Sequence, residues 1–370
     1  MHLFGALQIF ERGNALVPAT KSQRLRVLVL YNQVGEDEYE KLKQVDPATL
    51  GFTPEYPIRV PTAREEYNAI VRALRKERFR VRAVNVEESL QKLESLLHRN
   101  PPDVVFNLIE SFHDVPLLEG AVAHFYELHR VAYTGAPAFA LNLCQRKGLT
   151  KQVLLANGVP TPRFTLLSKP SIPKRHGLHY PVIVKPSRED ASSGIDKESV
   201  VHDYAGLLER VKKIFAEYSP PIIVEEFIEG RELHVSILGN DPPVVLPIIE
   251  YDFSELPADH PTIISYAAKW APLEEEYHRV HSVCPAVLPR RIRKNVEEIS
   301  LRAYRITGCR DYARLDLRLD ARNRVYVLEV NPNPDLTEGV SFMESAEKAG
   351  IAFPAALRKI VEFALNRRQP

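Results

Sequence analysis

The sequence predicts an α/β protein that begins with an open parallel sheet covered by helices. Three runs rich in apolar residues, at positions 26–32, 80–86 and 102–111, have the length of strands and contain β-branched residues. Two segments with apolar residues at helical spacing separate these runs. Such alternation is typical of parallel sheets, because the crossover between two parallel strands usually contains a helix.

Each element of this region has its own sequence signal. Residues 26–32 form the continuous apolar run of a buried strand, whereas residues 63–79 carry apolar side chains three and four positions apart, as a helix does. A second helix is expected to end near His98. Residues 1–22 are expected to form an irregular leader. The region should close with a helix at 116–130, a short strand at 131–135 and a helix near 138–157.

Polar residues follow the third strand of this predicted sheet. Asn107, Glu110 and Ser111 stand at or just beyond its carboxyl end. Ligands of open α/β sheets gather at that edge, so these three residues are candidate site residues. A polar strand end is about as often an ordinary turn, and the sequence leaves both interpretations open.

Lysines near the middle of the chain suggest a phosphate site. Lys147 and Lys151 lie one helical turn apart, so both can face one ligand, although a solvated helix surface is the alternative. The strand at 182–185 ends in Lys185 and leads into a loop of small and polar residues that contains Gly194. Such a loop brings backbone N–H groups close to phosphate oxygens. It has neither the P-loop pattern nor GxGxxG.

The apolar run at 221–233 is unusual for a buried strand. Two acidic residues, Glu225 and Glu226, interrupt it. An edge at a hinge between domains tolerates such residues, and its backbone could hydrogen-bond an adenine while Glu232 reaches a ribose.

Residues 314–337 predict a hairpin with a metal-binding face. Two strand-like runs flank a polar turn, and Asp316, Glu329 and Asn331 supply oxygen ligands. Glu329 and Asn331 share one strand face, and Asp316 can lie beside them across the hairpin. Hard cations such as Mg²⁺ prefer oxygen ligands and are completed by substrate phosphates. A solvated charged face is the alternative.

Composition narrows the classes of function. The chain has 370 residues, enough for two or three domains, and its 49 basic and 48 acidic residues give a formal charge of +1. This balance gives no support to nucleic-acid or membrane-surface partners. The scattered Cys144, Cys284 and Cys309 predict a reduced, cytoplasmic protein. The N-terminal apolar run, interrupted by Glu11 and Arg12, is too short for a membrane span.

Several motifs between about residues 103 and 351 occur together in a recognisable order. They are VAYTG, RKGLTK, GVPTP, YPVIVKPSREDASSGI, VEEFIEGREL, SYAAKW, ARLDLRLD, VYVLEVNPNP and EKAGI. In this order they resemble the ATP-grasp superfamily, and most closely its D-alanine–D-alanine ligase branch. The resemblance implies an ATP-grasp fold behind an N-terminal open-sheet domain. The implied domains are residues 1–145, a central ATP-grasp subdomain at 146–230, and a C-terminal subdomain with the metal ligands and a lid loop at 231–370.

The activity that the resemblance implies is ATP-dependent formation of an amide or peptide bond. ATP converts a carboxylate to an acyl phosphate, and an amine then attacks it. The implied cofactors are ATP and Mg²⁺, with Mn²⁺ as an alternative, and the partners are small amino-acid or carboxylate substrates. A homodimer through the N-terminal domain is common in the family.

The resemblance also implies a role for individual residues. Lysines matching Lys147 and Lys185 hold the α- and β-phosphates, and the loop at 187–194 covers the triphosphate. A lysine matching Lys269 reaches the γ-phosphate from a mobile loop at about 250–285, and an arginine matching Arg314 stabilises the oxyanion. The implied nucleotide-binding residues are Lys147, Lys185, Ser193, Glu225, Glu226, Phe227, Ile228, Glu232 and Lys269. The implied catalytic residues are Arg314, Lys269 and Ser192, and the implied metal ligands are Asp316, Glu329 and Asn331.

The departures from the family lie on the amino-acid side of the site. A serine and a tyrosine that help to fix the first substrate are replaced by Ala191 and Trp270, and the early glutamate has only a weak match at 34–40. Asp335 replaces a glycine, and Ser341 is the nearest candidate for a shifted serine. An acid at 335 repels a substrate carboxylate or pairs with a substrate amine. The candidate substrate-binding residues are Glu110, Ser111, Trp270, Asp335 and Ser341.

We therefore expect a ligase for a substrate pair other than two D-alanines. The alternatives are a standard D-alanine–D-alanine ligase, a carboxylase or kinase of the same fold, and a non-catalytic ATP-binding protein derived from a ligase. Trp270 stacks on a substrate or simply closes the lid on the core, and the sequence does not decide between these roles.

Overall fold

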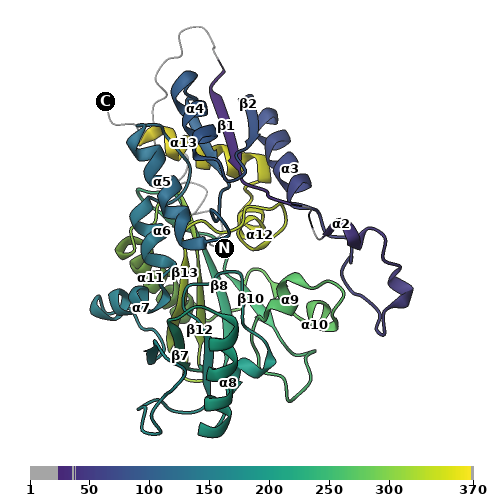
Figure 1. Cartoon of the computed structure of the whole chain (residues 1–370), viewed down its shortest axis with the longest axis vertical. Helices are drawn as coiled ribbons and strands as arrows, with labels where there is room; N and C mark the ends of the chain where they lie inside the picture. The colour runs from purple at the N-terminus through teal and green to yellow at the C-terminus, as the bar shows by residue number, and fades with distance from the viewer. Residues whose placement is uncertain (1–23, 36, 38, 368–370) are drawn as a thin grey trace.

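The computed structural model describes residues 24–35, 37 and 39–367, and this part contains three β-sheets arranged along the long axis of the molecule (Figure 1). The first sheet has the order β2-β1-β3 and is parallel throughout. Its strands are β1 (Arg26–Tyr31), β2 (Arg80–Asn85) and β3 (Val104–Asn107). The predicted N-terminal open parallel sheet is confirmed. The predicted leader at 1–22 lies outside the described residues.

Helices cover both faces of this sheet. One face carries α3 (Ala63–Lys76), which begins with a capping box between Thr62 and Glu65. The other face carries α4 (Leu90–Arg99), α5 (Glu119–Leu128) and α6 (Ala138–Cys144). The core on the α3 side also contains Leu357 and Ile360, which come from the far end of the chain. The helices α12 (Ser341–Lys348) and α13 (Phe353–Asn366) therefore complete the layer over the N-terminal sheet (Figure 1).

The central sheet has the order β4-β7-β5-β6. Its strands are β4 (Phe164–Leu167), β5 (Val182–Pro186), β6 (Val200–Val201) and β7 (Ile222–Glu226). One face packs on α8 (Tyr204–Glu217), which begins where the side chain of Asp203 caps the N–H of Gly206. The opposite face of this sheet is not covered by α8, so its side chains can contribute to the candidate site.

The third sheet carries the predicted hairpin at its edge. Its order is β11-β10-β8-β12-β13, and the short β9 (Val244–Val245) pairs with β8. The other strands are β8 (Arg231–Leu238), β10 (Ile249–Asp252), β11 (His281–Val283), β12 (Tyr312–Leu319) and β13 (Val325–Asn331). The long helix α11 (Arg290–Ile306) covers one face, with Val296 and Ala303 in the shared core.

Several predicted elements differ from the structure in extent. Residues 131–135 make only an isolated bridge, Val105 to Tyr133, rather than a full strand. The predicted helix at 138–157 is divided into α6 and α7 (Lys147–Ala156). The region at 250–285, expected as a loop, contains β10, β11 and the short helices α9 (Tyr266–Trp270) and α10 (Glu275–Arg279). We call residues 250–285 the lid.

The predicted strand at 221–233 is two strands, β7 and β8, which belong to different sheets. The chain changes direction at Gly230, which has a φ of +134°. A Cβ there would lie 2.2 Å from the carbonyl oxygen of Leu319, so only glycine allows this close approach. Glu225 and Glu226 are therefore the last residues of β7 and lie where the chain passes from the second sheet to the third. The sequence predicts a hinge at this position.

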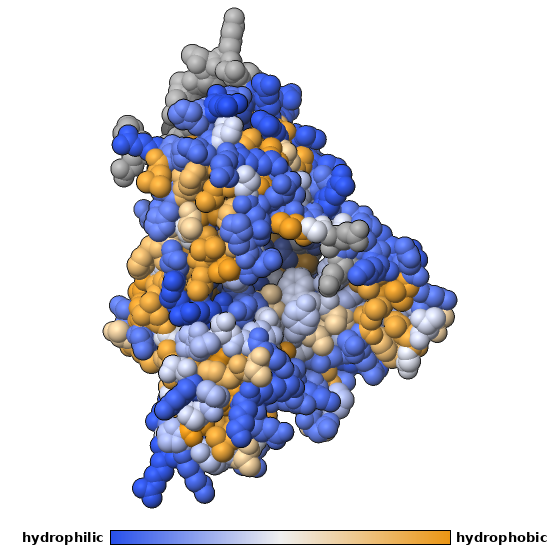
Figure 2. Space-filling view, in the orientation of Figure 1, coloured by the Kyte–Doolittle hydropathy of each residue, from blue (hydrophilic) through white to orange (hydrophobic). Residues whose placement is uncertain are grey.

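Among the described residues, no helix has the length and apolar character needed to cross a membrane. The surface is largely hydrophilic, with scattered apolar areas, and it is hollowed below the N-terminal lobe (Figure 2). The N-terminal segment from α2 (Tyr39–Leu42) to α3 extends beside the lid helices (Figure 1).

Candidate active site

The predicted metal ligands come together on the β12–β13 hairpin. Asp316 pairs with Glu329, and Arg314 pairs with Asn331. The register then shifts, because Leu317 pairs with Val327 and one residue of β13 bulges out. The amide nitrogen of Asn331 donates to Oδ2 of Asp316 at 3.1 Å. Three oxygen-bearing side chains thus form one cluster at the end of the hairpin.

Cations neutralise both carboxylates of this cluster. The guanidinium of Arg314 donates to both oxygens of Asp316, at 2.7 and 2.9 Å, and Nζ of Lys147 lies 3.4 Å from Oε2 of Glu329. Burial raises the pKa of each acid, but the adjacent cations outweigh it and hold the pKa of Asp316 and Glu329 below the usual values. Two ionised carboxylates and an amide oxygen suit Mg²⁺ or Mn²⁺, which prefer hard ligands.

A second group of charges lies near this cluster, where the buried Glu225 is placed between two lysines. Glu225 accepts ion pairs from Nζ of Lys151 at 2.8 Å and from Nζ of Lys185 at 2.6 Å. The side chains of Lys151 and Glu225 are only 1% and 2% exposed, so the pairing compensates for their burial. Lys147 points instead to Glu329, so the two lysines of α7 contact different acids.

The loop at 187–194 is folded back toward α7. Nζ of Lys147 donates to the carbonyl oxygen of Glu189 at 2.6 Å. Ala191 and Ser192 both have positive φ angles, which turns the backbone sharply. The hydroxyl of Ser193 donates to the hydroxyl of Tyr218 at 3.3 Å. We call residues 187–194 the phosphate loop, because it covers Lys147 next to the metal cluster.

The hinge between the second and third sheets provides an apolar surface. Phe227 packs against Ile183 and Ile263. Its N–H donates to the carbonyl oxygen of Pro181, and the N–H of Glu226 donates to that of Arg163, both at 2.9 Å. The carboxylate of Glu226 faces outward to His179 at 2.8 Å. Ile228 follows on the connection to β8.

Glu232 and Arg318 hold this hinge from the third sheet. Arg318, which is 2% exposed, places its guanidinium 3.3 Å from Glu232 and 4.9 Å from the ring centre of Phe227. It also donates to the carbonyl oxygens of Gly230 and Thr262. Burial raises the pKa of Glu232 to about 7, although Arg318 opposes the shift.

The lid contacts the phosphate loop through its helix α9. The indole Nε1 of Trp270 donates to the carbonyl oxygen of Ala191 at 2.8 Å. Lys269 lies with Nζ 5.2 Å from the Trp270 ring, and its pKa is lowered by burial and by Arg314. The hydroxyl of Tyr39 donates to the carbonyl oxygen of Trp270 at 3.1 Å. The lid therefore contacts both the phosphate loop and the N-terminal segment.

Several acidic residues lie close together where the substrate is expected to bind. Partial loss of hydration and repulsion from Asp335 raise the pKa of both Glu110 and Glu66 to about 7, although Glu110 is an exposed residue. Asp190 of the phosphate loop adds to the shift at Glu110. The carboxylate of Asp335 accepts a hydrogen bond from the N–H of Thr337 at 2.8 Å. Acids from the N-terminal domain, the phosphate loop and the β13–α12 connection thus influence one another.

Two other candidate substrate residues lie near the same edge. Ser341 is the first residue of α12, and its buried hydroxyl has no hydrogen-bond partner among the described residues. Ser111 contributes its carbonyl oxygen, which accepts a hydrogen bond from the side chain of Asn32 at 2.7 Å. Of the weak match for the early glutamate, Glu36 and Glu38 lie outside the described residues.

The NPNP segment is anchored to the N-terminal domain. The amide of Asn333 donates to Glu119 at 2.7 Å and accepts from the N–H of Ala136 at 2.9 Å. A Cβ on Gly135 would lie 2.4 Å from the Asn333 side chain, so glycine permits this contact. The anchor fixes the chain just before Asp335.

Sequence reasoning missed several residues of this region. His234 lies with Nε2 3.6 Å from Asp316, and burial lowers its pKa well below the usual value. Arg318 and Glu66 were also missed. The alternation in β8 places His234 on the same face as Glu232, a signal that could have identified it. Glu66 lies on α3, far from the motifs, and carries no such signal.

The fold and the site define an ATP-grasp enzyme, in which lysines and carboxylates of two sheets lie close together. A family model described as "D-ala D-ala ligase C-terminus" matches residues 153–362. A D-alanine–D-alanine ligase of Carboxydothermus hydrogenoformans is 33% identical over 311 residues, which cover 82% of this chain and 93% of the relative. The chain therefore belongs to the D-alanine–D-alanine ligase family, and it is an ATP-dependent ligase.

Other similar proteins agree with this membership. An uncharacterized protein of Sinorhizobium fredii, y4sG, is 33% identical over 280 residues, 72% of this chain and 78% of the relative. The solved D-alanine–D-alanine ligase of Bacillus anthracis complexed with ATP has a TM-score of 0.68 and 21% identity. That match covers 92% of this chain and 98% of the other, and it supports the ATP-grasp fold.

Proposed function

We propose that this ligase joins a carboxylate and an amine other than two D-alanines. The observation that carries the proposal is the acidic substrate side, where Asp335 raises the pKa of both Glu110 and Glu66. A free carboxylate of an acceptor substrate is repelled by these acids, whereas an ammonium group is attracted. We infer an acceptor that presents an amine, rather than a carboxylate, to Asp335.

The side chains expected to contact the nucleotide support ATP binding at the position that is usual in the ATP-grasp fold. Lys147 and Lys185 would turn from their present acids toward the α- and β-phosphates, and the phosphate loop with Ser192 and Ser193 would cover them. The surface at Phe227 offers the ring contact for adenine. The remaining proposed nucleotide contacts are Glu225, the backbone of Glu226 and Ile228, and Glu232.

The ion pairs of the site explain how it can hold these charges before a nucleotide binds. Arg314 is held by Asp316, and Lys147 by Glu329. A divalent cation held by Asp316, Glu329 and Asn331 would screen the phosphate charge. The lysines would then be free to turn toward the phosphates, and Arg314 toward the acyl oxygen.

The chemistry follows from these positions. A substrate carboxylate oxygen attacks the γ-phosphorus of ATP, which gives an acyl phosphate and releases ADP. The amine nitrogen then attacks the acyl carbon, the carbon–oxygen bond breaks, and phosphate leaves with loss of a proton from nitrogen. Lys269 would neutralise the transferred phosphoryl group and Arg314 the tetrahedral oxyanion. The closed lid would keep water from the acyl phosphate.

The three cysteines, all among the described residues, are free thiols, which agrees with the proposed cytoplasmic location. A homodimer through the N-terminal domain stays a proposal that rests on the family resemblance.

Exchange of Asp335 for asparagine tests the proposed substrate class. The amide keeps the size of the side chain and its acceptor for the N–H of Thr337 but removes the negative charge. We expect the variant to lose preference for amine-bearing acceptors by about tenfold, as loss of one charge-assisted contact implies, with little change in the KM for ATP. An unchanged ranking of acceptors would show that Asp335 has no part in recognition.

A further inference from the structure

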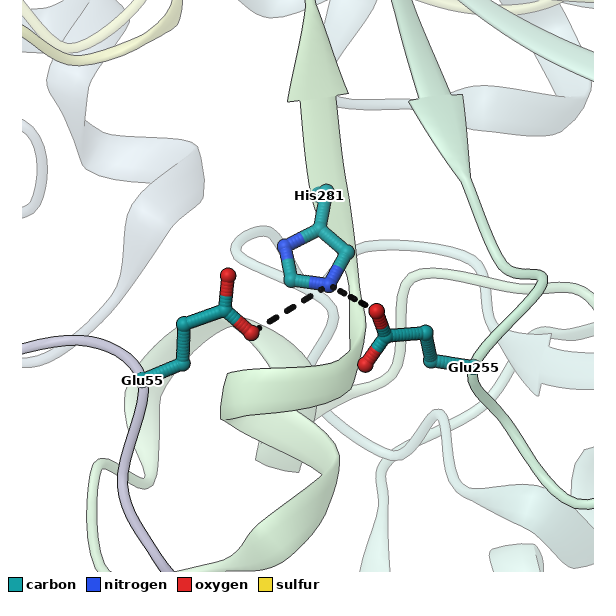
Figure 3. Close-up of side chains that lie close together, drawn as sticks. All are labelled: Glu55, Glu255 and His281. Atoms are coloured by element: carbon teal, nitrogen blue, oxygen red, sulfur yellow. Dashed lines mark ion pairs between the residues drawn. The ribbon is translucent and has the colours of Figure 1, made fainter.

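Three metal-binding side chains from separate segments meet outside the active site. They are Glu55 from the chain between α2 and α3, Glu255 from the lid just after β10, and His281 at the start of β11 (Figure 3). Nε2 of His281 lies 3.6 Å from Oε2 of Glu55 and 3.6 Å from Oε1 of Glu255. The three ligand atoms all lie within 4.8 Å of one another.

The other nitrogen of His281 fixes the direction of this ligand atom. Nδ1 lies 2.7 Å from the hydroxyl oxygen of Tyr56. With Nδ1–H donating to that oxygen, the lone pair of Nε2 is directed at the two carboxylates (Figure 3). Nε2 is buried and has no hydrogen-bond partner in the part of the chain that the structure describes. A lone pair facing two anionic oxygens is unfavourable, and either a proton on Nε2 or a metal ion between the three atoms relieves it.

We propose that Glu55, Glu255 and His281 bind a Zn²⁺ ion. Tetrahedral Zn²⁺ holds nitrogen and oxygen ligands at about 2.0–2.2 Å, which separates neighbouring ligand atoms by about 3.4 Å. The two nitrogen–oxygen distances of 3.6 Å are close to this spacing. One imidazole and two carboxylates are a ligand set that Zn²⁺ accepts, with the fourth position left for water.

The surroundings of the three ligands support the site. The second oxygen of Glu255 is held by Arg279 at 3.2 Å, so Oε1 stays free to bind the metal. Tyr56 has the role of the outer partner that orients a metal-bound histidine. Asp252 lies directly opposite His281 in the β10–β11 ladder and adds negative charge.

The bound metal would join two parts of the chain that already touch. The N–H of Tyr56 donates to Nδ1 of His278 in the lid at 3.0 Å, and the rings of Phe52 and His278 lie 5.2 Å apart. Glu55 belongs to this N-terminal segment, whereas Glu255 and His281 belong to the lid. The metal would thus fasten the N-terminal segment to the lid that carries Lys269 and Trp270.

Zinc titration of the whole protein tests the proposal. The metal is first removed with a chelator, excess Mg²⁺ is added to occupy the hard-ligand cluster at Asp316 and Glu329, and Zn²⁺ binding is measured by calorimetry. We expect one more equivalent of Zn²⁺ on the wild type than on His281→Gln or Glu55→Gln. Tyr56→Phe should keep the equivalent but bind it about 10- to 100-fold more weakly, as loss of an outer partner implies.

The matched control is His113→Gln. Its imidazole also pairs with a glutamate, with Nδ1 2.9 Å from Glu88, but no third ligand joins that pair among the residues that the structure describes. This variant should bind as much Zn²⁺ as the wild type. Equal zinc uptake by the wild type and Glu55→Gln would overturn the proposal and leave an imidazolium ion pair. Because Glu55 is 54% exposed, its exchange leaves the fold intact, which circular dichroism would check.

Hydrogen exchange tests the link to the lid. Zn²⁺ should slow amide exchange in residues 52–58 and 278–284 of the wild type, and it should have no such effect in Glu55→Gln. Zinc binding without slower exchange in both segments would contradict the proposed fastening.

Discussion

The indole nitrogen of Trp270 donates to the carbonyl oxygen of Ala191 at 2.8 Å, and this bond joins the lid to the phosphate loop. The family has different side chains at both positions, a tyrosine and a serine as the resemblance implies. Here the contact uses the backbone of residue 191 instead of its side chain. We therefore propose that Trp270 closes the lid.

Exchange of Trp270 for phenylalanine tests this closure. The ring next to Lys269 is kept, but the hydrogen bond is lost. A typical net value of about 1 kcal/mol for such a bond predicts about fivefold more ADP release without amide product, because water reaches the acyl phosphate. The ratio of ADP to amide measures this leak. A ratio equal to that of the wild type would exclude a sealing role for the bond.

Removal of two metal ligands tests the hairpin cluster. Glu329→Gln with Asn331→Ala should lower metal-dependent turnover by more than about 100-fold, because loss of the metal forfeits several kcal/mol of charge stabilisation. Circular dichroism should be unchanged. Arg322→Ala, an exposed residue in the turn of the same hairpin, is the control and should be active. Near-normal turnover of the double variant would refute the metal assignment.

The raised pKa of Glu110 predicts a pH dependence. The carboxyl group of Glu110 loses its proton as pH rises through about 7, so the cluster of acids around Asp335 becomes more negative in that pH range. If it binds an ammonium group, kcat/KM for the amine should rise through neutral pH while the amine is protonated. Asp335→Asn removes one cause of the raised pKa and should move this rise to lower pH. A profile that is flat, or identical in both proteins, would contradict this role.

The raised pKa values of Glu110 and Glu66 also make the free energy of unfolding depend on pH. The folded state binds more protons than the unfolded state between pH 4.5, the ordinary pKa of glutamate, and about 7. The contributions of Glu110 and Glu66 to the free energy of unfolding therefore decrease as pH rises through this window. In Glu66→Gln, denaturant unfolding should show a smaller decrease over the same range. An unaltered pH dependence would contradict the raised pKa.

The buried pair of Arg318 and Glu232 predicts a strong effect on stability. Arg318→Met leaves Glu232 buried without its partner, which should cost about 3–5 kcal/mol of unfolding free energy at a pH well above 7, where Glu232 is ionised. Adding Glu232→Gln removes the uncompensated charge and should recover part of that loss. Denaturant unfolding of the single and double variants measures both effects. Equal losses in the single and double variants would show that a buried charge on Glu232 is not what destabilises Arg318→Met.

Local sequence signals predicted the main elements of the fold. The pairing of Asp316 with Glu329 across the hairpin follows from the strand period and agrees with the predicted arrangement, whereas their role as metal ligands stays a prediction. The extent of β7 was overestimated because the apolar pattern continues through Gly230, and only the close approach to Leu319 reveals the break. Residues 131–135 have the composition of a strand, but only Tyr133 forms a bridge.

The contacts that the sequence could not reveal join segments far apart along the chain. Glu66 on α3 reaches the environment of Asp335 only because α12 and α13 pack on the N-terminal sheet. The meeting of Glu55 with His281 depends on how the N-terminal segment runs over the lid. No periodicity or motif encodes such meetings, because they depend on the packing of whole layers.

The most direct test of the proposed function is ADP release from ATP and Mg²⁺ with pools of L-amino acids, D-amino acids and small diacids, with mass spectrometry of each reaction. We predict ADP release with a new mass equal to two substrates less one water, from a pair other than two D-alanines. Release that is fastest with D-alanine alone, and that yields its dipeptide, would contradict the proposed substrate class. No release with any pool, despite ATP binding, would contradict ligase activity on these substrates.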